Sequence, residues 1–112
     1  MMLSYPYSWQ ERRPLSHEKT LYIPDHYLSH RGYPLPCWES FLSGPGDLMA
    51  ECCSGNGEWI LKQALQNPHQ RWVAIEWDFP RLCQIARKRE GQGVPNLYLI
   101  SGDATTWILH YL

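Results

Sequence analysis

The sequence predicts an α/β fold of the doubly wound type, in which helices connect the strands of a parallel sheet. From residue 47 onward, short apolar runs alternate with stretches whose apolar residues recur at helical spacing, and short loops separate them. Before residue 46, six of the nine prolines and five of the seven tyrosines occur, a density that disfavours long helices and interior strands. We therefore divide the chain into an irregular arm, residues 1–45, and a partial α/β domain, residues 46–112.

The first strand–helix–strand unit begins directly after the glycines at the end of the arm. Residues 47–52 are a short apolar run, which indicates a strand. Residues 58–66 carry apolar side chains at helical spacing, and Asn67-Pro68 ends this predicted helix. Residues 71–76 are a nearly continuous apolar run that ends in an acid, as is typical of a buried parallel strand.

A second unit of the same kind follows. Residues 78–90 are predicted to form a helix with an aspartate as N-cap, closed by Gly91 and Gly93. Residues 96–100 form the third predicted strand, and residues 104–112 resemble the opening of a further helix. Strand, helix, strand, helix and strand in this order are expected to form a doubly wound sheet.

The arm has fewer local signals. One short helix is predicted over residues 36–42, where a proline can occupy the first turn and apolar residues face one side. The arm also places cations among its aromatic residues: Arg12, Arg13, Lys19 and Arg31. This mixture can contact RNA through phosphate charge and base stacking, or the aromatic residues can simply pack on the domain behind them. The residues alone leave both interpretations open.

Composition excludes several classes of protein. A chain of 112 residues with 44% hydrophobic and 19% charged residues is expected to fold, and its net charge of −1 argues against nucleic-acid binding through bulk electrostatics alone. The sequence contains neither an apolar run of 18 residues nor a secretory signal, so we expect a cytoplasmic protein without a membrane span.

The cysteines and histidines do not predict a metal site. The four cysteines lack a C-x-x-C pair, and Cys52 and Cys53 are adjacent, which suits neither an ordinary disulfide nor a zinc site. We expect reduced cysteines that act as small core residues. His26 and His30 are four residues apart, but we interpret them as surface side chains.

Candidate site residues follow the predicted strands, where parallel sheets bind their ligands. Gly55 and Gly57 lie in the turn after the first strand and allow a sharp entry into the helix. Three acids lie at or beside the same edge of the sheet: Glu51 near the end of the first strand, Glu76 at the end of the second and Asp103 after the third. A single acid is usually a loop cap, whereas three in phase favour a shared ligand that carries hydroxyl groups and positive charge.

The turn favours one nucleoside cofactor over another. A dinucleotide usually requires a third glycine where this chain has Ile60, and Glu51 and Glu58 would place negative charge beside its pyrophosphate. S-adenosylmethionine carries an amine, a sulfonium and ribose hydroxyls but no phosphate. The acids therefore favour S-adenosylmethionine over NAD.

Three segments resemble the bacterial tRNA (guanine-N7-)-methyltransferase family: the acid-initiated glycine turn of residues 51–60, the strand Trp72-Val-Ala-Ile-Glu76 and the sequence Ser101-Gly-Asp-Ala104. The resemblance covers about residues 46–107, and the arm resembles the variable N-terminal region of the family only loosely. It implies the N-terminal half of a Rossmann-like class I methyltransferase sheet, with S-adenosylmethionine as cofactor and tRNA as partner. Cys53 stands where the generic motif has its first glycine.

By this resemblance, Glu51, Glu76 and Asp103 contact the cofactor, and Gly55 and Gly57 shape the turn. The implied reaction is methyl transfer to N7 of a guanine in the tRNA variable loop. Because the N7 lone pair is already nucleophilic, catalysis would rest mostly on alignment and charge solvation rather than on a strong base.

The family's substrate-side motifs, Asp-Pro-Trp-Pro-Lys and a later Thr-Asp segment, do not occur in this sequence. The chain stops inside a predicted helix, so we expect a truncated chain, either an N-terminal fragment or one piece of a split protein whose missing half is a separate chain, and we assign no catalytic residue. Three alternatives remain: a nonfunctional remnant, a cofactor-binding module without turnover, and a fragment of an NAD-binding oxidoreductase.

Overall fold

A computed structural model describes residues 15–17, 19–22 and 43–105 of the chain. Its elements, in chain order, are β1 (Leu15–His17), β2 (Thr20–Tyr22), β3 (Leu48–Cys52), α2 (Glu58–Gln66), β4 (Arg71–Glu76), α3 (Phe79–Gln92) and β5 (Leu97–Ser101). Within the described residues, no helix is both long and apolar enough to span a membrane.

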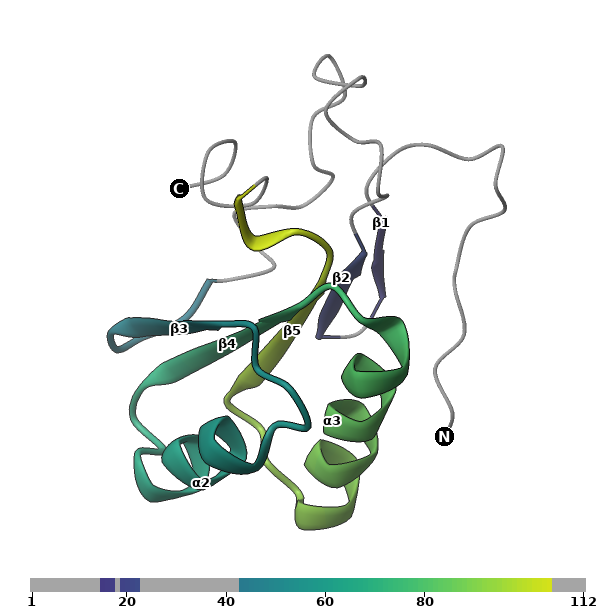
Figure 1. Cartoon of the computed structure of the whole chain (residues 1–112). Helices are drawn as coiled ribbons and strands as arrows, with labels where there is room; N and C mark the ends of the chain where they lie inside the picture. The colour runs from purple at the N-terminus through teal and green to yellow at the C-terminus, as the bar shows by residue number, and fades with distance from the viewer. Residues whose placement is uncertain (1–14, 18, 23–42, 106–112) are drawn as a thin grey trace.

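The strands form one sheet in the order β1-β2-β5-β4-β3. The pairs β2–β5, β5–β4 and β4–β3 are parallel, and only the short pair β1–β2 is antiparallel. Both helices pack on the same face of the sheet (Figure 1). The two β-α-β units from β3 to β5 therefore have the predicted α/β architecture with a parallel sheet.

The hydrophobic core lies between the sheet and the two helices. Alternate residues of the strands point toward the helices and contact Ile60, Leu82 and Ile85, none of which is exposed to solvent. The other set of alternate residues in the central strands, such as Val73 and Ile100, is also buried. Burial on both faces explains why β4 and β5 are apolar along almost their whole length.

The predicted elements of the α/β region are confirmed with small shifts. The predicted ranges of α2 and β4 are correct, β3 begins at Leu48, and β5 ends at Ser101. The second helix continues through Gly91 and ends at Gly93, whose φ of 62° gives the left-handed C-cap.

The arm differs from the prediction because part of it joins the sheet. β2 pairs with β5 in parallel, and its three residues are buried. Pro14 and Pro24 lie outside these short strands, so they do not interrupt the sheet hydrogen bonds, while Thr20, Leu21 and Tyr22 include residue types that favour strands. The predicted helix at residues 36–42, Cys37, the histidine pair and residues 106–112 of the last predicted helix lie outside the described residues.

One asparagine connects the residue before β5 to the end of α2 and the turn that follows it, at the amino edge of the sheet. The Asn96 side-chain amide donates to the carbonyl oxygens of Ala64, Asn67 and Gln70, at 3.0, 3.1 and 2.9 Å. These carbonyls belong to the end of α2 and to the turn that follows it, where helix termini leave acceptors without helical partners. Asn96 therefore fixes the position of α2 relative to β4 and β5.

Candidate functional site

The turn from β3 to α2 has the backbone of a glycine-rich loop. Gly55 and Gly57 have φ angles of 60° and 81°, in the left-handed region. Cys53 has the same conformation, with φ 60°, and is the one non-glycine residue with positive φ in the described part of the chain. The structure thus places Cys53 in a conformation that glycine adopts at much lower cost. Its amide donates to the Ile75 carbonyl at 2.8 Å, which ties the turn to the end of β4.

The two glycines have different surroundings. A Cβ atom added to Gly57 would lie 2.7 Å from Cγ1 of the fully buried Ile85, so this glycine permits close packing of the turn on α3. A Cβ atom added to Gly55 would have no heavy atom within 4 Å. Gly57 therefore serves the packing of the fold, whereas the space beside Gly55 is open.

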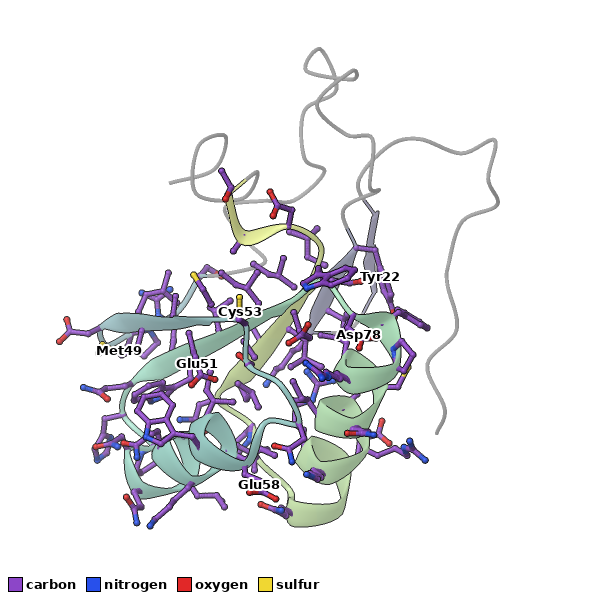
Figure 2. All side chains as sticks on the ribbon, in the orientation of Figure 1. Tyr22, Met49, Glu51, Cys53, Glu58 and Asp78 are labelled. Atoms are coloured by element: carbon purple, nitrogen blue, oxygen red, sulfur yellow. The ribbon has the colours of Figure 1, made fainter. Side chains whose placement is uncertain are left out.

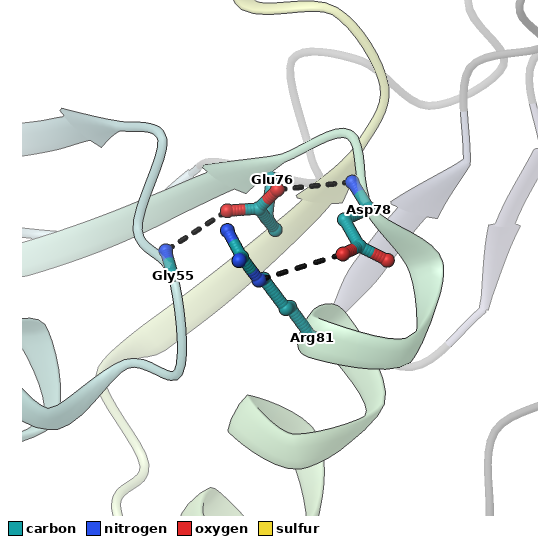
Figure 3. Close-up of polar contacts among 4 residues, drawn as sticks. All are labelled: Gly55, Glu76, Asp78 and Arg81. Atoms are coloured by element: carbon teal, nitrogen blue, oxygen red, sulfur yellow. Dashed lines mark hydrogen bonds and ion pairs between the residues drawn. The ribbon is translucent and has the colours of Figure 1, made fainter.

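Glu76 lies at the end of β4 and joins the turn to the next helix. Its Oε1 accepts the Gly55 amide at 2.8 Å and its Oε2 accepts the Asp78 amide at 2.9 Å (Figure 3). The residue is only 2% exposed. The carboxylate thus bridges the glycine turn and the first residue before α3, a bracing role that the sequence analysis did not predict. Asp78 in turn pairs with Arg81 at 3.4 Å on the surface.

Glu51 projects from β3 toward the face of the sheet that carries the helices (Figure 2). Its Oε1 is buried and has no hydrogen-bond partner. Leaving a buried carboxylate oxygen unsatisfied is costly. Glu51 is therefore the acid in the described region whose carboxylate retains a buried acceptor for a donor from outside the chain.

The remaining predicted acid and one aromatic side chain lie at the same edge. Asp103 follows β5 and is exposed. Because Glu76 pairs in register with Ser101, the ends of β4 and β5 are level, and the structure brings the ends of all three acid-bearing strands to one edge of the sheet. Trp77, which directly follows Glu76, is 69% exposed. Trp77 is not among the residues that the sequence pattern predicted for the site, although its position after a strand-ending acid is a usable signal.

Five amides of the turn donate to acceptors within the protein. Those of Cys53 and Ser54 donate to the Ile75 carbonyl, that of Gly55 to Glu76, that of Gly57 to the Ser54 carbonyl and that of Glu58 to the Asn56 side chain. A phosphate at a helix N-terminus is normally held by such amides. In this conformation those five amides are already committed to acceptors other than a phosphate.

Two surface grooves lie away from this edge. One, of about 500 Å³, lies between α2 and α3 and includes Leu65 and Lys88 in its lining. The other, of about 570 Å³, lies at the opposite, amino edge and includes Arg71 and Tyr98. Neither includes Glu51, Glu76 or Asp103.

The thiols follow the prediction only in part. Cys83 is buried in the core, and burial raises the pKa of its thiol above the ordinary value, with an opposing effect from Arg87. Cys52 and Cys53 are exposed, so the expectation that they act as core residues is wrong. They are exposed because β3 lies at the border of the described sheet. The described residues contain no group of three side chains able to hold a metal ion.

Comparison with known proteins identifies the class of protein that this fold and turn define. Residues 46–112 match the model of a family described as "Putative methyltransferase". The matched region runs from the end of the arm through both β-α-β units and includes every predicted site residue. The chain thus belongs to a family of putative methyltransferases.

Curated relatives identify the family. A tRNA (guanine-N(7)-)-methyltransferase of Chlamydia felis is 39% identical over 110 residues, which cover 98% of this chain and 49% of the relative. The protein of the same name from Chlamydia trachomatis is 34% identical with the same coverage, and that of Lacticaseibacillus casei is 26% identical over 96 residues, or 85% of this chain and 42% of the relative.

The chain belongs to the tRNA (guanine-N7-)-methyltransferase family. It spans about half the length of the chlamydial relatives it matches. The similarity to these relatives extends through the arm, beyond the range of about residues 46–107 that the sequence motifs alone indicated.

Proposed function

We propose that this chain provides the S-adenosylmethionine-binding part of a cytoplasmic tRNA (guanine-N7-)-methyltransferase. The observation that carries the proposal is the buried, unpartnered carboxylate oxygen of Glu51 at the edge of the sheet where ligands of doubly wound folds bind. A ligand with a positively charged amine satisfies such an oxygen better than a phosphate does. The names of the relatives supply the substrate class, a guanine of tRNA.

Each residue of the proposed site has a separate role. Glu51 accepts a hydrogen bond from the amine of the methionine portion, and the open space beside Gly55 admits the cofactor close to the backbone. Glu76 accepts from the ribose hydroxyls, and Asp103 adds negative charge at the rim. Trp77 offers an exposed indole on which adenine can stack. When bound, S-adenosylmethionine supplies the activated methyl group.

Ribose binding by Glu76 has a structural requirement. The carboxylate is 2% exposed and both of its oxygens already accept backbone amides. We infer that the Gly55 amide moves away from Oε1 when the ribose hydroxyls approach. The carboxylate thereby exchanges one hydrogen bond for others, and the shape of the glycine turn becomes coupled to occupancy of the site.

The NAD alternative has less support. Five amides of the turn donate to acceptors within the protein and do not point to a pyrophosphate. Glu58 in the first turn of α2 also disfavours an anion at the helix N-terminus.

Isothermal titration of the 112-residue chain tests the proposal. S-adenosylmethionine is expected to bind, and NAD is not. Glu51→Gln is expected to weaken binding by about tenfold or more, because a charge-assisted hydrogen bond is lost. Glu58→Gln is the matched control: it removes one negative charge from the same turn, but its side chain is exposed. Binding of NAD alone, or equal effects of both variants, would overturn the assignment.

A further inference from the structure

Two neighbouring thiols lie where β3 ends and the glycine turn begins. Cys52 is the last residue of β3, and Cys53 is the first residue of the turn. Both side chains are exposed, whereas Cys83, the third cysteine in the described part of the chain, is buried. Neither exposed thiol has a role in the proposed cofactor site, so the chemistry of the pair requires its own explanation.

The fold places both thiols on the same face of the sheet. Cys52 pairs in register with Ile75, and Glu51 pairs with Ala74, a core residue beneath the helices. Glu51 therefore faces the helices, and Cys52 faces the opposite side of the sheet. A further extended residue would point back toward the helices. Cys53 instead has a φ of 60°, and Figure 2 shows its side chain on the side of the sheet away from α2 and α3. The left-handed residue thus places on one face two thiols that an extended strand would direct to opposite faces.

We propose that Cys52 and Cys53 are a redox modification site, at which a hydroperoxide converts the two thiols into a disulfide between adjacent residues. The sulfur of one thiol attacks the peroxide, an S–O bond forms as the O–O bond breaks, and the leaving oxygen takes the thiol proton. That sulfur gives up two electrons and becomes a sulfenic acid, while the peroxide is reduced to water or an alcohol. The second thiol then attacks the sulfenic sulfur, an S–S bond forms, and the hydroxyl group leaves with the second thiol proton as water.

The product is a labile disulfide rather than a structural one. The peptide bond between the two residues is trans, because the described chain contains no cis peptide bond. Their Cα atoms are therefore about 3.8 Å apart, closer than the about 4.4–6.8 Å of an ordinary disulfide. Strained and exposed disulfides are the ones most easily reduced, and in reducing compartments they act as transient or sensing bonds. The pair therefore suits reversible oxidation.

Closing the disulfide ring alters the glycine turn. The Cys53 amide donates to the Ile75 carbonyl at 2.8 Å, and the Gly55 amide, two residues later, donates to Glu76 at 2.8 Å. Rotation of the peptide between the two cysteines displaces the first of these hydrogen bonds and moves the backbone that carries the second. Oxidation is therefore expected to weaken S-adenosylmethionine binding. This consequence rests on the proposed function, whereas the oxidation itself does not.

Peptide mass spectrometry of the 112-residue chain after treatment with hydrogen peroxide tests the modification. The native chain is expected to lose two hydrogen atoms, with an internal disulfide in the peptide that contains both Cys52 and Cys53, and a dithiol reductant is expected to restore the thiols. Cys52→Ser and Cys53→Ser retain one thiol each and should stop at the sulfenic acid or proceed to the sulfinic acid. Cys37→Ser retains the pair and should form the internal disulfide as the native chain does.

Isothermal titration before and after peroxide treatment measures the consequence for the cofactor. The affinity of the native chain for S-adenosylmethionine is expected to fall about tenfold or more and to recover after reduction. The affinity of Cys52→Ser, which cannot form the disulfide, is expected to stay within about threefold. If this variant proves unfolded, the recovery of the native chain on reduction still decides the question.

Three results would overturn the modification: no loss of hydrogen, sulfinic acids on the pair without an internal disulfide, or a disulfide that joins either residue to Cys37 or to a second chain. An internal disulfide that leaves the affinity unchanged removes the link to the cofactor. A chain that forms the internal disulfide but binds no S-adenosylmethionine in either state retains the modification and refutes the proposed function. Binding by a chain that forms no such disulfide has the opposite meaning.

Discussion

Replacing Gly57 by alanine is expected to destabilise the fold through two separable effects. The residue has a φ of 81°, which an L-residue adopts only with strain. The new methyl group would also lie 2.7 and 3.1 Å from the Cγ1 and Cγ2 atoms of Ile85, well inside the usual contact distance of about 3.5–4.0 Å. Ile85 is completely buried and has little room to move away.

The expected loss of stability follows from these terms. Left-handed backbone costs a non-glycine residue about 1–2 kcal/mol, and overpacking a tight site costs about 1–3 kcal/mol. The lower conformational entropy of alanine in the unfolded chain offsets about 0.4–1 kcal/mol. Gly57→Ala should therefore lower the free energy of unfolding by about 1–5 kcal/mol, which is a substantial part of the about 5–15 kcal/mol that a small domain possesses.

Urea denaturation followed by tryptophan fluorescence measures this loss, and Gly55→Ala is the matched control. Gly55 has a φ of 60° but open space at the Cβ position, so only the backbone term applies and the loss should be about 1 kcal/mol or less. In a double-mutant cycle, Ile85→Ala should remove the clash and make the two substitutions non-additive by about 1–3 kcal/mol. Equal losses for both glycines, together with additive effects, would refute the packing explanation.

Four further predictions concern residues at the amino edge of the sheet, in the glycine turn and at the cysteines. Asn96→Ala should lower the free energy of unfolding by about 1–3 kcal/mol, because three backbone carbonyls at the end of α2 and in the turn after it lose their common donor. Urea denaturation checks this, and an unchanged midpoint would contradict the role of Asn96 in positioning α2. Cys53→Val should destabilise by about 1–3 kcal/mol, because a β-branched side chain tolerates a φ of 60° least. Cys53→Gly should not destabilise, because glycine removes the left-handed cost that Cys53 already bears. Similar midpoints in urea for the two variants would count against the left-handed conformation. Iodoacetamide at pH 8 should modify Cys52 faster than Cys83, as judged by peptide mass spectrometry, because burial raises the pKa of Cys83. Because burial raises the pKa of Cys83, the folded state disfavours its thiolate. The contribution of the protonated thiol to the free energy of unfolding is therefore fully present below the ordinary thiol pKa of 9.0 and is lost as the pH rises above that value. In urea denaturation, Cys83→Ala should lose less stability than the native chain between pH 8 and 10.

The strands and helices from residue 47 onward could be predicted because their local signals agree with their tertiary environment. The helical spacing and the Asn67-Pro68 stop define α2 closely. The uninterrupted apolar run of residues 71–76 indicates burial on both faces, which the sheet provides. Gly93 rather than Gly91 ends α3, because helix termination depends on a left-handed φ that composition alone does not assign.

The features that the sequence did not predict depend on contacts between distant residues. Thr20, Leu21 and Tyr22 are too few to show a strand periodicity, and they form β2 only because β5 offers a free edge. The pattern of strand-ending acids correctly predicted that Glu76 lies at the end of a strand, at the edge of the sheet. The sequence spacing of these acids could not show that both carboxylate oxygens of Glu76 accept backbone amides. The exposure of Cys52 likewise follows from the position of β3 in the sheet order.

The pairing of β2 with β5 has a consequence for the order in which the chain folds during synthesis. Thr20 pairs with Leu99, so nearly the whole described chain separates the two partners. At about 5–20 residues per second, a ribosome needs about 4–16 s to make the intervening stretch of about 80 residues. During this time the buried side chains of Leu21 and Tyr22 have no sheet to cover them. The β-α-β units can form first, and β2 is then the last described parallel strand to join, through a long-range contact that closes a loop of about 80 residues.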